Sequence, residues 1–406
     1  MKKHLLSTSA IALGVAMAAP ASAAEWDLAW GGFANVHVGA TDIDVDDNTA
    51  EAGADFDGVD VYTNAEIIFS PSVTLDNGMT FGYSVQFEAM NGFSIDESYM
   101  TISSDTLGRV ILGSENSAGY LLMGSVYTTL PTSLPINSRS TSAFIPVTGS
   151  TGFRQAGLSS LTEVAGNNDV QRITYFTPSF NGLTLGVSYA ATDKGNASNN
   201  FGVDRDAGGD VVDIFDIGAS YSQSFNGVDI GLAARWGTGD RNPTSAEAAT
   251  CLEGIPSSTG TTKISIADSG DCGDDITLEE GTEADAGGDP TTWAVGGTIG
   301  VNGFTFGATY AENNDDRAGD IGDQKGYSFG IGYDLAGPWS IGATMYHGEE
   351  ETSGQDNEYK AYQVGARRSL GSGVSWDIYY VRQETQNSDG YEVEGDLFGT
   401  AVNLSF

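Results

Sequence analysis

The sequence ends in Leu397-Phe398-Gly399-Thr400-Ala401-Val402-Asn403-Leu404-Ser405-Phe406, and this stretch decides the fold. In a strand, successive side chains alternate between two faces, so Phe398, Val402, Leu404 and Phe406 share one face with Thr400. Apart from Leu397, the other face carries only glycine, alanine, asparagine and serine. An apolar face that ends in an aromatic ring is typical of a bilayer-facing strand that finishes at the water interface. We therefore expect an outer-membrane protein.

The amino-terminal region has the features of a secretory signal peptide. Lys2 and Lys3 precede an apolar stretch over residues 5–19, and Ala21-Ser22-Ala23 supplies the small side chains of a cleavage site. We expect a signal peptide over residues 1–23. The apolar stretch is shorter than the about 20 residues of a spanning helix, and the rest of the chain holds no longer one. A closed barrel is therefore the expected way across the membrane.

The composition agrees with a protein of the cell envelope. The chain has 17 basic and 55 acidic residues, which give a net charge of −38. This charge argues against nucleic acid or an anionic inner leaflet as a partner. The chain also has 55 glycines but only 10 prolines, and its aromatic residues are mostly Phe and Tyr, which favours many strands joined by tight turns.

Alternation with a period of two predicts sixteen strands in residues 24–406. Aromatic residues gather near strand ends, as do Trp236, Trp293, Tyr310 and Trp339, where the girdles of a membrane barrel are expected. The predicted strands lie near residues 30–40, 61–69, 79–89, 95–103, 108–113, 170–176, 183–191, 214–222, 228–236, 293–300, 304–310, 326–334, 339–347, 358–368, 374–382 and 397–406.

The connections between these strands largely alternate between tight and long. Tight turns such as Asn181-Gly182, Asn226-Gly227 and Asn302-Gly303 follow even-numbered strands, whereas long connections such as 114–169 and 237–290 follow odd-numbered ones. A membrane barrel with short periplasmic turns and long external loops explains this asymmetry. A soluble β-sandwich or adhesin, the alternative, has no need to gather its tight turns at one end. We expect an all-β fold, a transmembrane antiparallel β-barrel of about sixteen strands.

Three stretches resemble a known family. They are Glu97-Ser98-Tyr99-Met100-Thr101-Ile102, Leu107-Gly108-Arg109-Val110-Ile111-Leu112-Gly113-Ser114-Glu115-Asn116 and the final ten residues. With them the sequence resembles the general porins of Gram-negative bacteria, especially those of alphaproteobacteria. The resemblance implies a homotrimer of sixteen-stranded barrels, with the loop after strand five, residues 114–169, folded into the lumen to narrow the pore. It also implies that the barrel-insertion machinery recognises the last strand, with Phe406 as the assembly signal.

The polar faces of the predicted strands suggest which charges line the lumen. Opposed charges across a narrow pore create a transverse field that orients polar solutes. We predict that Glu115, on the inserted loop, faces Arg109 and Arg172 at the constriction. The alternative is that these are solvated wall residues away from the narrowest point. The alternation places on the inward face Arg109, Arg172, Arg235, Arg367, Glu66, Glu88, Asp216, Asp229 and Asp377.

The long segment 237–290 contains both cysteines of the chain, Cys251 and Cys272. In a secreted protein two cysteines in one external loop predict a disulfide. The acidic residues around them offer oxygen ligands for Ca²⁺, but their spacing matches no calcium loop, so we expect a solvated acidic loop and no cofactor. The cluster consists of Asp268, Asp271, Asp274, Asp275, Glu279 and Glu280.

The expected function is passive diffusion of small hydrophilic solutes and ions, with a moderate preference for cations because the external loops are acidic. The expected partners are outer-membrane lipid, these solutes, two further copies of the chain and the barrel-insertion machinery. An alternative is a substrate-selective porin, with aromatic rings of the inserted loop stacking on a sugar-like solute. Those rings belong to Tyr120, Tyr127, Phe144 and Phe153.

An outer-membrane barrel enzyme, such as a protease or lipase, is a less favoured alternative. After the signal peptide the chain has only two histidines, His37 and His347. We expect the first to face the lumen and the second to lie near the outer rim. Neither belongs to a recognisable Ser/His/acid motif, which a histidine-dependent hydrolase requires.

Overall fold

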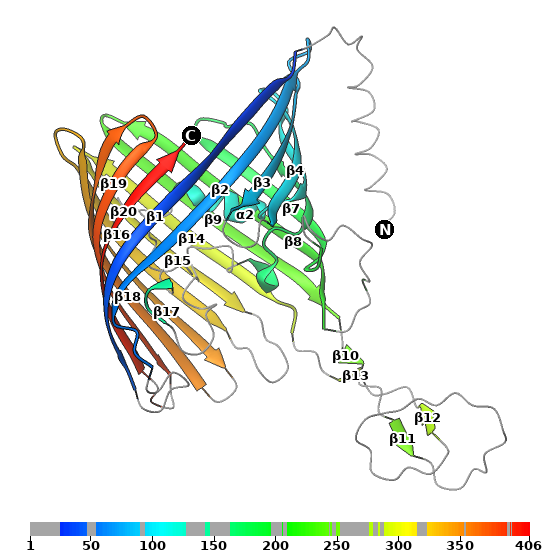
Figure 1. Ribbon diagram of the computed structural model, residues 1–406. Helices are drawn as coiled ribbons and strands as arrows, with labels where there is room; N and C mark the ends of the chain where they lie inside the picture. Colours follow the sequence, from blue (N-terminus) through cyan, green and yellow to red (C-terminus); the bar gives the residue numbers. More distant parts are fainter. Residues whose placement is uncertain are drawn as a thin grey trace.

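A computed structural model describes residues 25–46, 54–89, 94–126, 143–146, 163–195, 205, 209–242, 244–245, 249–251, 276–278, 283–284, 288–314, 323–352, 355–387, 390 and 392–406. Its main body is one closed barrel of sixteen antiparallel strands (Figure 1), so the predicted fold class is confirmed. Among these residues, no helix has both the length and the apolar character required to cross a membrane.

Neighbouring strands of the barrel are neighbours in the sequence, apart from the pair that closes it. Each of the sixteen predicted strands is confirmed. They are β1 (Asp27–Val45), β2 (Gly58–Thr74), β3 (Thr80–Glu88), β4 (Ile95–Ser104), β5 (Gly108–Ser114), β6 (Gln171–Phe176), β7 (Leu183–Thr192), β8 (Val211–Phe225), β9 (Val228–Arg241), β14 (Thr291–Val301), β15 (Phe304–Asn314), β16 (Gln324–Asp334), β17 (Trp339–Thr352), β18 (Gln355–Gly371), β19 (Val374–Asn387) and β20 (Glu392–Ser405).

Two short ladders outside the barrel were not predicted. β10 (Thr244–Ser245) pairs with β13 (Glu283–Ala284), and β11 (Ala249–Cys251) pairs with β12 (Ile276–Leu278). Strands of two or three residues are too short to show an alternating pattern, which is why the sequence gives no sign of them.

The barrel closes where β20 pairs with β1. The register runs from Phe33 opposite Ser405 to Val45 opposite Val393. At its end, the N–H of Phe406 donates to the carbonyl of Gly32 at 3.1 Å, and the N–H of Gly32 donates to the carbonyl of Phe406 at 3.0 Å. Closure leaves no strand edge of the barrel unpaired.

The two faces of the wall differ as the alternation predicts. In the final strand Phe398 is 64% exposed while its neighbour Leu397 is fully buried. Outward aromatic residues also cluster: Trp236 lies opposite Trp293, whose ring centroid is 5.1 Å from that of Tyr310. Large apolar side chains exposed around a barrel are explained by contact with lipid, with the aromatic clusters at its boundary.

The tight turns have the predicted geometry. Both central residues have positive φ in Asn181-Gly182 (48° and 87°), Asn226-Gly227 (50° and 81°) and Asn302-Gly303 (50° and 82°). This is the type I′ hairpin turn, which asparagine and glycine tolerate. Because strands alternate in direction, these turns share one end of the barrel with the C-terminus, while β10–β13 lie beyond the other end (Figure 1).

The orientation of the barrel can be tested with epitope tags. A tag inserted at Ser353, between β17 and β18, should be labelled by antibody on intact cells. A tag at Ser372, in the turn between β18 and β19, should be labelled only after the outer membrane is permeabilised, because this turn lies at the same end of the barrel as the Asn-Gly turns, which we assign to the periplasm. Labelling of the Ser372 tag on intact cells would show the reverse orientation.

Candidate functional site

The segment between β5 and β6 contacts the inward face of the wall. Its described parts are residues 115–126, which include helix α2 (Ala118–Met123) and the 3₁₀ turn η1 (Gly124–Val126), residues 143–146, and residues 163–170, which include the 3₁₀ turn η5 (Val164–Gly166). Figure 1 shows α2 among the strands of the barrel. The segment therefore joins side chains from separate parts of the wall.

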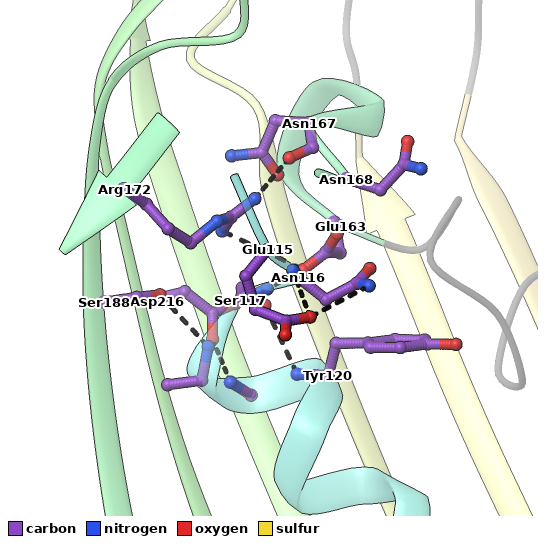
Figure 2. Close-up of polar contacts among 12 residues, drawn as sticks. Glu115, Asn116, Ser117, Tyr120, Glu163, Asn167, Asn168, Arg172, Ser188 and Asp216 are labelled. Carbon is purple, nitrogen blue, oxygen red and sulfur yellow. Dashed lines mark hydrogen bonds and ion pairs between the residues drawn. The ribbon is translucent and has the colours of Figure 1, made fainter. Parts of the chain in front are cut away.

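The first N–H groups of α2 are bound by acceptors from outside the helix (Figure 2). The N–H of Ser117 donates to Glu163 Oε1 at 2.6 Å, that of Ala118 to Ser188 Oγ at 3.1 Å, and that of Gly119 to Asp216 Oδ1 at 2.6 Å. These N–H groups have no partner inside a helix. Ser188 on β7 and Asp216 on β8 thus fasten the helix to the wall.

Two inward arginines are buried beside this anchor, each near a carboxylate. Arg235 Nη2 lies 2.7 Å from Asp216 Oδ2, and neither side chain is more than 2% exposed. Arg172 Nη1 lies 4.0 Å from Glu163 Oε1, and Arg172 also donates to the carbonyl of Asn167. The carboxylates that anchor α2 are therefore themselves balanced by positive charge.

Glycine is required where α2 meets the strands. A Cβ on Gly119 would lie 2.3 Å from Asp216 Oδ1, and one on Gly218 of β8 would lie 2.8 Å from the Cα of Gly119. Both distances are shorter than side chains tolerate, so the helix backbone rests directly on the strand backbone.

The middle of the segment packs against a different part of the wall. Phe144 and Ile145 are 5% and 0% exposed, in a cluster with Tyr346, Tyr359 and Tyr379 from β17, β18 and β19. The Tyr379 hydroxyl is 2.8 Å from Nδ1 of His37, which faces inward as expected. The expectation that Phe144 offers its ring to a solute is wrong, because the ring fills this core.

The other rings of that hypothesis are only partly described. Tyr120 is half-buried on α2, whereas Tyr127 and Phe153 lie outside the described residues. The second histidine, His347, stacks on the outward ring of Tyr327, with centroids 5.2 Å apart.

Carboxylates gather on the inward side of β2 to β4. Glu66 is directly opposite Glu88 in the β2–β3 register. Oxygens of Asp96, Glu97 and Asp169, which precedes β6, all lie within 4.8 Å of one another. None of the charged groups Glu66, Asp96, Glu97 and Asp169 has an ion pair with a base among the described residues. This wall therefore gathers carboxyl groups that have no basic partner within the described chain.

A β-bulge brings Asp96 and Glu97 together. Val85 pairs with Ser98 and Phe87 with Ile95, so Asp96 and Glu97 both oppose Gln86. A bulge of this kind re-aims side chains. Sequence reasoning missed Asp96, because strict alternation turns it toward lipid, and it did not single out Glu97, which alternation leaves on the inward face. A carboxylate on the lipid-facing side of a strand is energetically costly, and this cost was the sign in the sequence that Asp96 does not face lipid.

Glu115 does not pair with Arg109 or Arg172, contrary to our expectation. It is 4% exposed, and its Oε1 accepts the N–H of Asn116 at 2.9 Å (Figure 2). Arg109 is six residues away along β5, roughly 20 Å at 3.4 Å per residue, and its guanidinium lies 4.7 Å from the ring centroid of Phe176. Arg172 is directed at Glu163 instead.

Arg367 lies on the inward side of β18, far along the sheet from α2. Its Nε and Nη2 donate to Oδ1 and Oδ2 of Asp377 at 2.8 and 2.9 Å. This bidentate geometry is the strongest form of such a pair. Of the four inward arginines, only Arg109 is without a carboxylate partner within the described part of the chain.

The carboxyl of Asp169 has an abnormal pKa. Burial, followed by the charges of Asp96 and Glu163, raises its pKa from 3.8 to about 7. Between these two values the folded chain keeps a proton that the unfolded chain releases. The free energy of unfolding therefore falls as the pH rises from 3.8 to about 7. Above about pH 7 this carboxyl has no further effect on it.

Two predicted features are only partly within the described chain. Cys272 and all six residues of the acidic cluster, which lie between 268 and 280, are outside it, so the disulfide with Cys251 and the solvated loop remain predictions. Phe406 is described: its ring is 66% exposed, next to the seam between β20 and β1.

Comparison with known proteins gives one family. A family model described as Gram-negative porin matches residues 7–388. Among curated proteins no sequence is similar enough to match.

Several solved structures share the fold. The outer membrane channel DcaP of Acinetobacter baumannii has a TM-score of 0.58 at 12% identity, covering 96% of this chain and 100% of its own. The anion-selective porin of Comamonas acidovorans has a TM-score of 0.57 at 13% identity, covering 94% and 100%. A trimer form of OmpT, an outer membrane protein of Vibrio cholerae, has a TM-score of 0.55 at 11% identity, covering 95% and 100%. At these identities the likeness concerns the fold alone.

Proposed function

Because the chain belongs to the Gram-negative porin family, we propose that it is a passive outer-membrane channel for small hydrophilic solutes that prefers cations moderately. Its family and its barrel make it a channel, rather than an enzyme, in the outer membrane of a Gram-negative bacterium. The cation preference and the location of the narrowest point are the proposed parts.

The proposed preference for cations rests on the charges of the inward face of the barrel, where carboxylates without a basic partner outnumber arginines without an acidic one among the described residues. Arg172, Arg235 and Arg367 each have a carboxylate partner, so they contribute little net positive charge to the lumen. Glu66 and Asp96, in contrast, have no basic partner in the described chain, and Asp169 adds its negative charge only above about pH 7. Uncompensated negative charge along a water-filled path concentrates cations. The anion selectivity named for the Comamonas porin does not transfer at 13% identity.

We infer that residues 114–169 form the constriction. Two contacts support this role: α2 is fastened to β7 and β8, while Phe144 is packed against β17 to β19. The described parts of the segment are thus held at two distant parts of the wall. The lumen beside the β2–β4 carboxylates is then the path that solutes take.

Neutralising Glu66 and Glu88, which lie opposite each other on β2 and β3, should weaken the preference for cations. At about 8 Å in water, one charge contributes roughly 0.5 kcal/mol before screening. The double variant Glu66→Gln/Glu88→Gln should therefore lower the cation-to-anion permeability ratio by roughly two- to fivefold. Reversal potentials of purified protein in planar bilayers under a salt gradient measure this ratio.

The matched control is Asp275→Asn in the long segment 237–290. Charges more than a Debye length from the path are largely screened, so this variant should change the ratio less. An anion-selective parent channel would refute the proposal. A larger effect of Asp275→Asn than of the double variant would put the selective charges at the mouth rather than in the lumen.

We also propose a homotrimer, which the trimer form of the Vibrio cholerae protein supports. A signal peptide over residues 1–23 and a Cys251–Cys272 disulfide are further proposals that rest on the sequence.

A further inference from the structure

We propose that the lipid-facing side of β15 to β20 carries a binding site for one phospholipid of the periplasmic leaflet of the outer membrane. The site has two parts, an apolar hollow in the outer surface of the wall and the guanidinium of Arg368 beside it. One acyl chain lies in the hollow, and the phosphate of the same molecule binds Arg368. The site depends on the outer-membrane location of the barrel and not on the ion selectivity proposed above.

The hollow has the size of a ligand pocket. Its volume is about 610 Å³, within the range of about 300–1,000 Å³ that such pockets occupy. Its floor is formed by Ala343 on β17 and Ala366 on β18, which carry only a methyl group, while larger rings stand on both sides. These rings belong to Phe304 on β15, Tyr333 on β16, Tyr380 on β19 and Phe398 on β20. Phe304, Tyr380 and Phe398 are exposed, so the hollow opens toward lipid and not toward the lumen.

Arg368 lies beside this hollow, between two tryptophans. The register of the sheet places it directly opposite Trp339 on β17 and Trp376 on β19. Its guanidinium carbon is 5.6 Å from the centroid of the Trp339 ring, and the centroids of Trp339 and Trp376 are 5.8 Å apart. Tryptophan is enriched at the depth of the lipid headgroups.

The order of residues along β18 aligns the two parts of the site with a lipid. Arg368 lies three residues before Gly371, where β18 ends at a tight turn that we assign to the periplasm. Ala366, in the floor of the hollow, is two residues farther from this turn on the same face, or roughly 7 Å. A lipid whose headgroup lies at the tryptophans therefore has its acyl chain directed into the hollow.

Arg368 has no acidic partner in the described chain, in contrast to Arg382, the other arginine on this face. Arg382 forms ion pairs with Glu394 and Asp396 at 2.6 and 3.1 Å, whereas the contact of Arg368 is with the Trp339 ring. The nearest outward side chains on β17 to β19, apart from the two tryptophans, are all apolar. They are Ile341, Ala366, Leu370, Val374 and Ile378.

A phosphate supplies the charge that this face lacks. A basic side chain on the lipid-facing side of a barrel is costly, and the cost falls toward the headgroups. Guanidinium groups bind phosphate through two parallel N–H···O bonds. A phospholipid thus satisfies the free donors of Arg368 and covers the apolar hollow with one molecule.

Native mass spectrometry of the full folded chain tests the site. Purified protein in a maltoside detergent is titrated with dimyristoylphosphatidylglycerol, and the fraction of subunits that retain lipid is measured. The parent should retain one lipid per subunit in a saturable manner. Arg368→Gln should weaken retention about fivefold, because it removes one basic group at the membrane surface. Ala366→Leu fills part of the hollow and should weaken retention at least about fourfold, the effect of one displaced methylene group.

Two control variants carry the same substitutions elsewhere on the lipid-facing side. Ala234→Leu on β9 and Arg382→Gln on β19 should leave retention unchanged, because neither residue lines the hollow. The proposal would be overturned by a parent that retains no phospholipid, by equal retention in the parent and Arg368→Gln, or by a loss in the controls as large as in the site variants. A lower trimer content of Ala366→Leu with unchanged lipid retention would instead assign the hollow to a second copy of the chain.

A second measurement on the parent keeps the test decisive if a variant does not fold. Dimyristoylglycerol has the same acyl chains as the phospholipid but lacks the phosphate. The parent should retain it about fivefold more weakly than dimyristoylphosphatidylglycerol. Equal retention of the two lipids would show that Arg368 does not bind the headgroup and would contradict the site.

Discussion

Asp216→Ala is expected to give channels with larger and noisier single-channel conductance and a lower unfolding temperature. The variant removes the acceptor of the Gly119 N–H and leaves Arg235 buried without its carboxylate. Breaking a buried ion pair by removing one partner costs about 3–5 kcal/mol. We expect α2 to leave the wall as a result and the constriction to widen. Planar-bilayer recording and thermal unfolding in detergent measure the two effects.

Two further variants separate anchoring from stability. Asp216→Leu/Arg235→Met removes both charges, so much of the stability should return while α2 still lacks its acceptor and conductance stays high. Asp377→Asn weakens the Arg367 pair on β18 and β19, away from α2, so it should lower stability without enlarging the channel. If Asp377→Asn raised conductance as much as Asp216→Ala, the anchor would not be what holds the constriction.

Deletion of Phe406 is expected to reduce folded protein in the outer membrane severalfold while synthesis continues. The deletion removes the two backbone hydrogen bonds with Gly32 and the exposed ring at the interface. An unpaired backbone group at the membrane costs several kcal/mol. The resemblance to porins also implies that this residue is read during insertion. The amount of heat-modifiable barrel in membrane fractions measures the loss.

Single substitutions at the same position separate these causes. Phe406→Tyr keeps both the ring and the backbone, so assembly should be close to that of the parent. Phe406→Gly keeps the backbone hydrogen bonds but removes the ring, and a loss equal to that of the deletion would identify the ring as the signal. Normal assembly of the deletion variant would show that the residue is incidental.

The barrel could be predicted from the sequence because its rules are local. Alternation assigns each strand its faces, and Asn226-Gly227 sets even the β8–β9 register, in which Asp216 lies opposite Gly237 and Arg235 opposite Gly218. The sequence was therefore sufficient to predict that Asp216 and Arg235 lie close together. The contacts of Gly119 with Asp216 and of Glu163 with Arg172 could not be predicted, because residues 114–169 have no period that fixes where they lie.

The carboxylates on the inward side of β2 to β4 show a second limit of prediction from the sequence. The bulge at Asp96 and Glu97 breaks the period of two, so a rule based on alternation gives Asp96 the wrong face. Glu115 was expected to face Arg109 because one lies on the inserted segment and the other on the inward face of β5, but β5 carries the two residues roughly 20 Å apart. Contacts between the inserted segment and the wall depend on the three-dimensional path of the segment.

The seam between β1 and β20 also sets the order in which the molecule folds. His37 and Tyr379, which meet near the seam, are 342 positions apart in the chain. Bringing such distant residues together costs about 5 kcal/mol of loop-closure entropy beyond a constant. All other neighbouring strands of the barrel are consecutive in its strand order, so the sheet can grow from local contacts. It keeps two open edges until its first and last strands meet. We therefore expect ring closure to be the late, slow step of folding, with the growing sheet in need of protection from aggregation until it occurs.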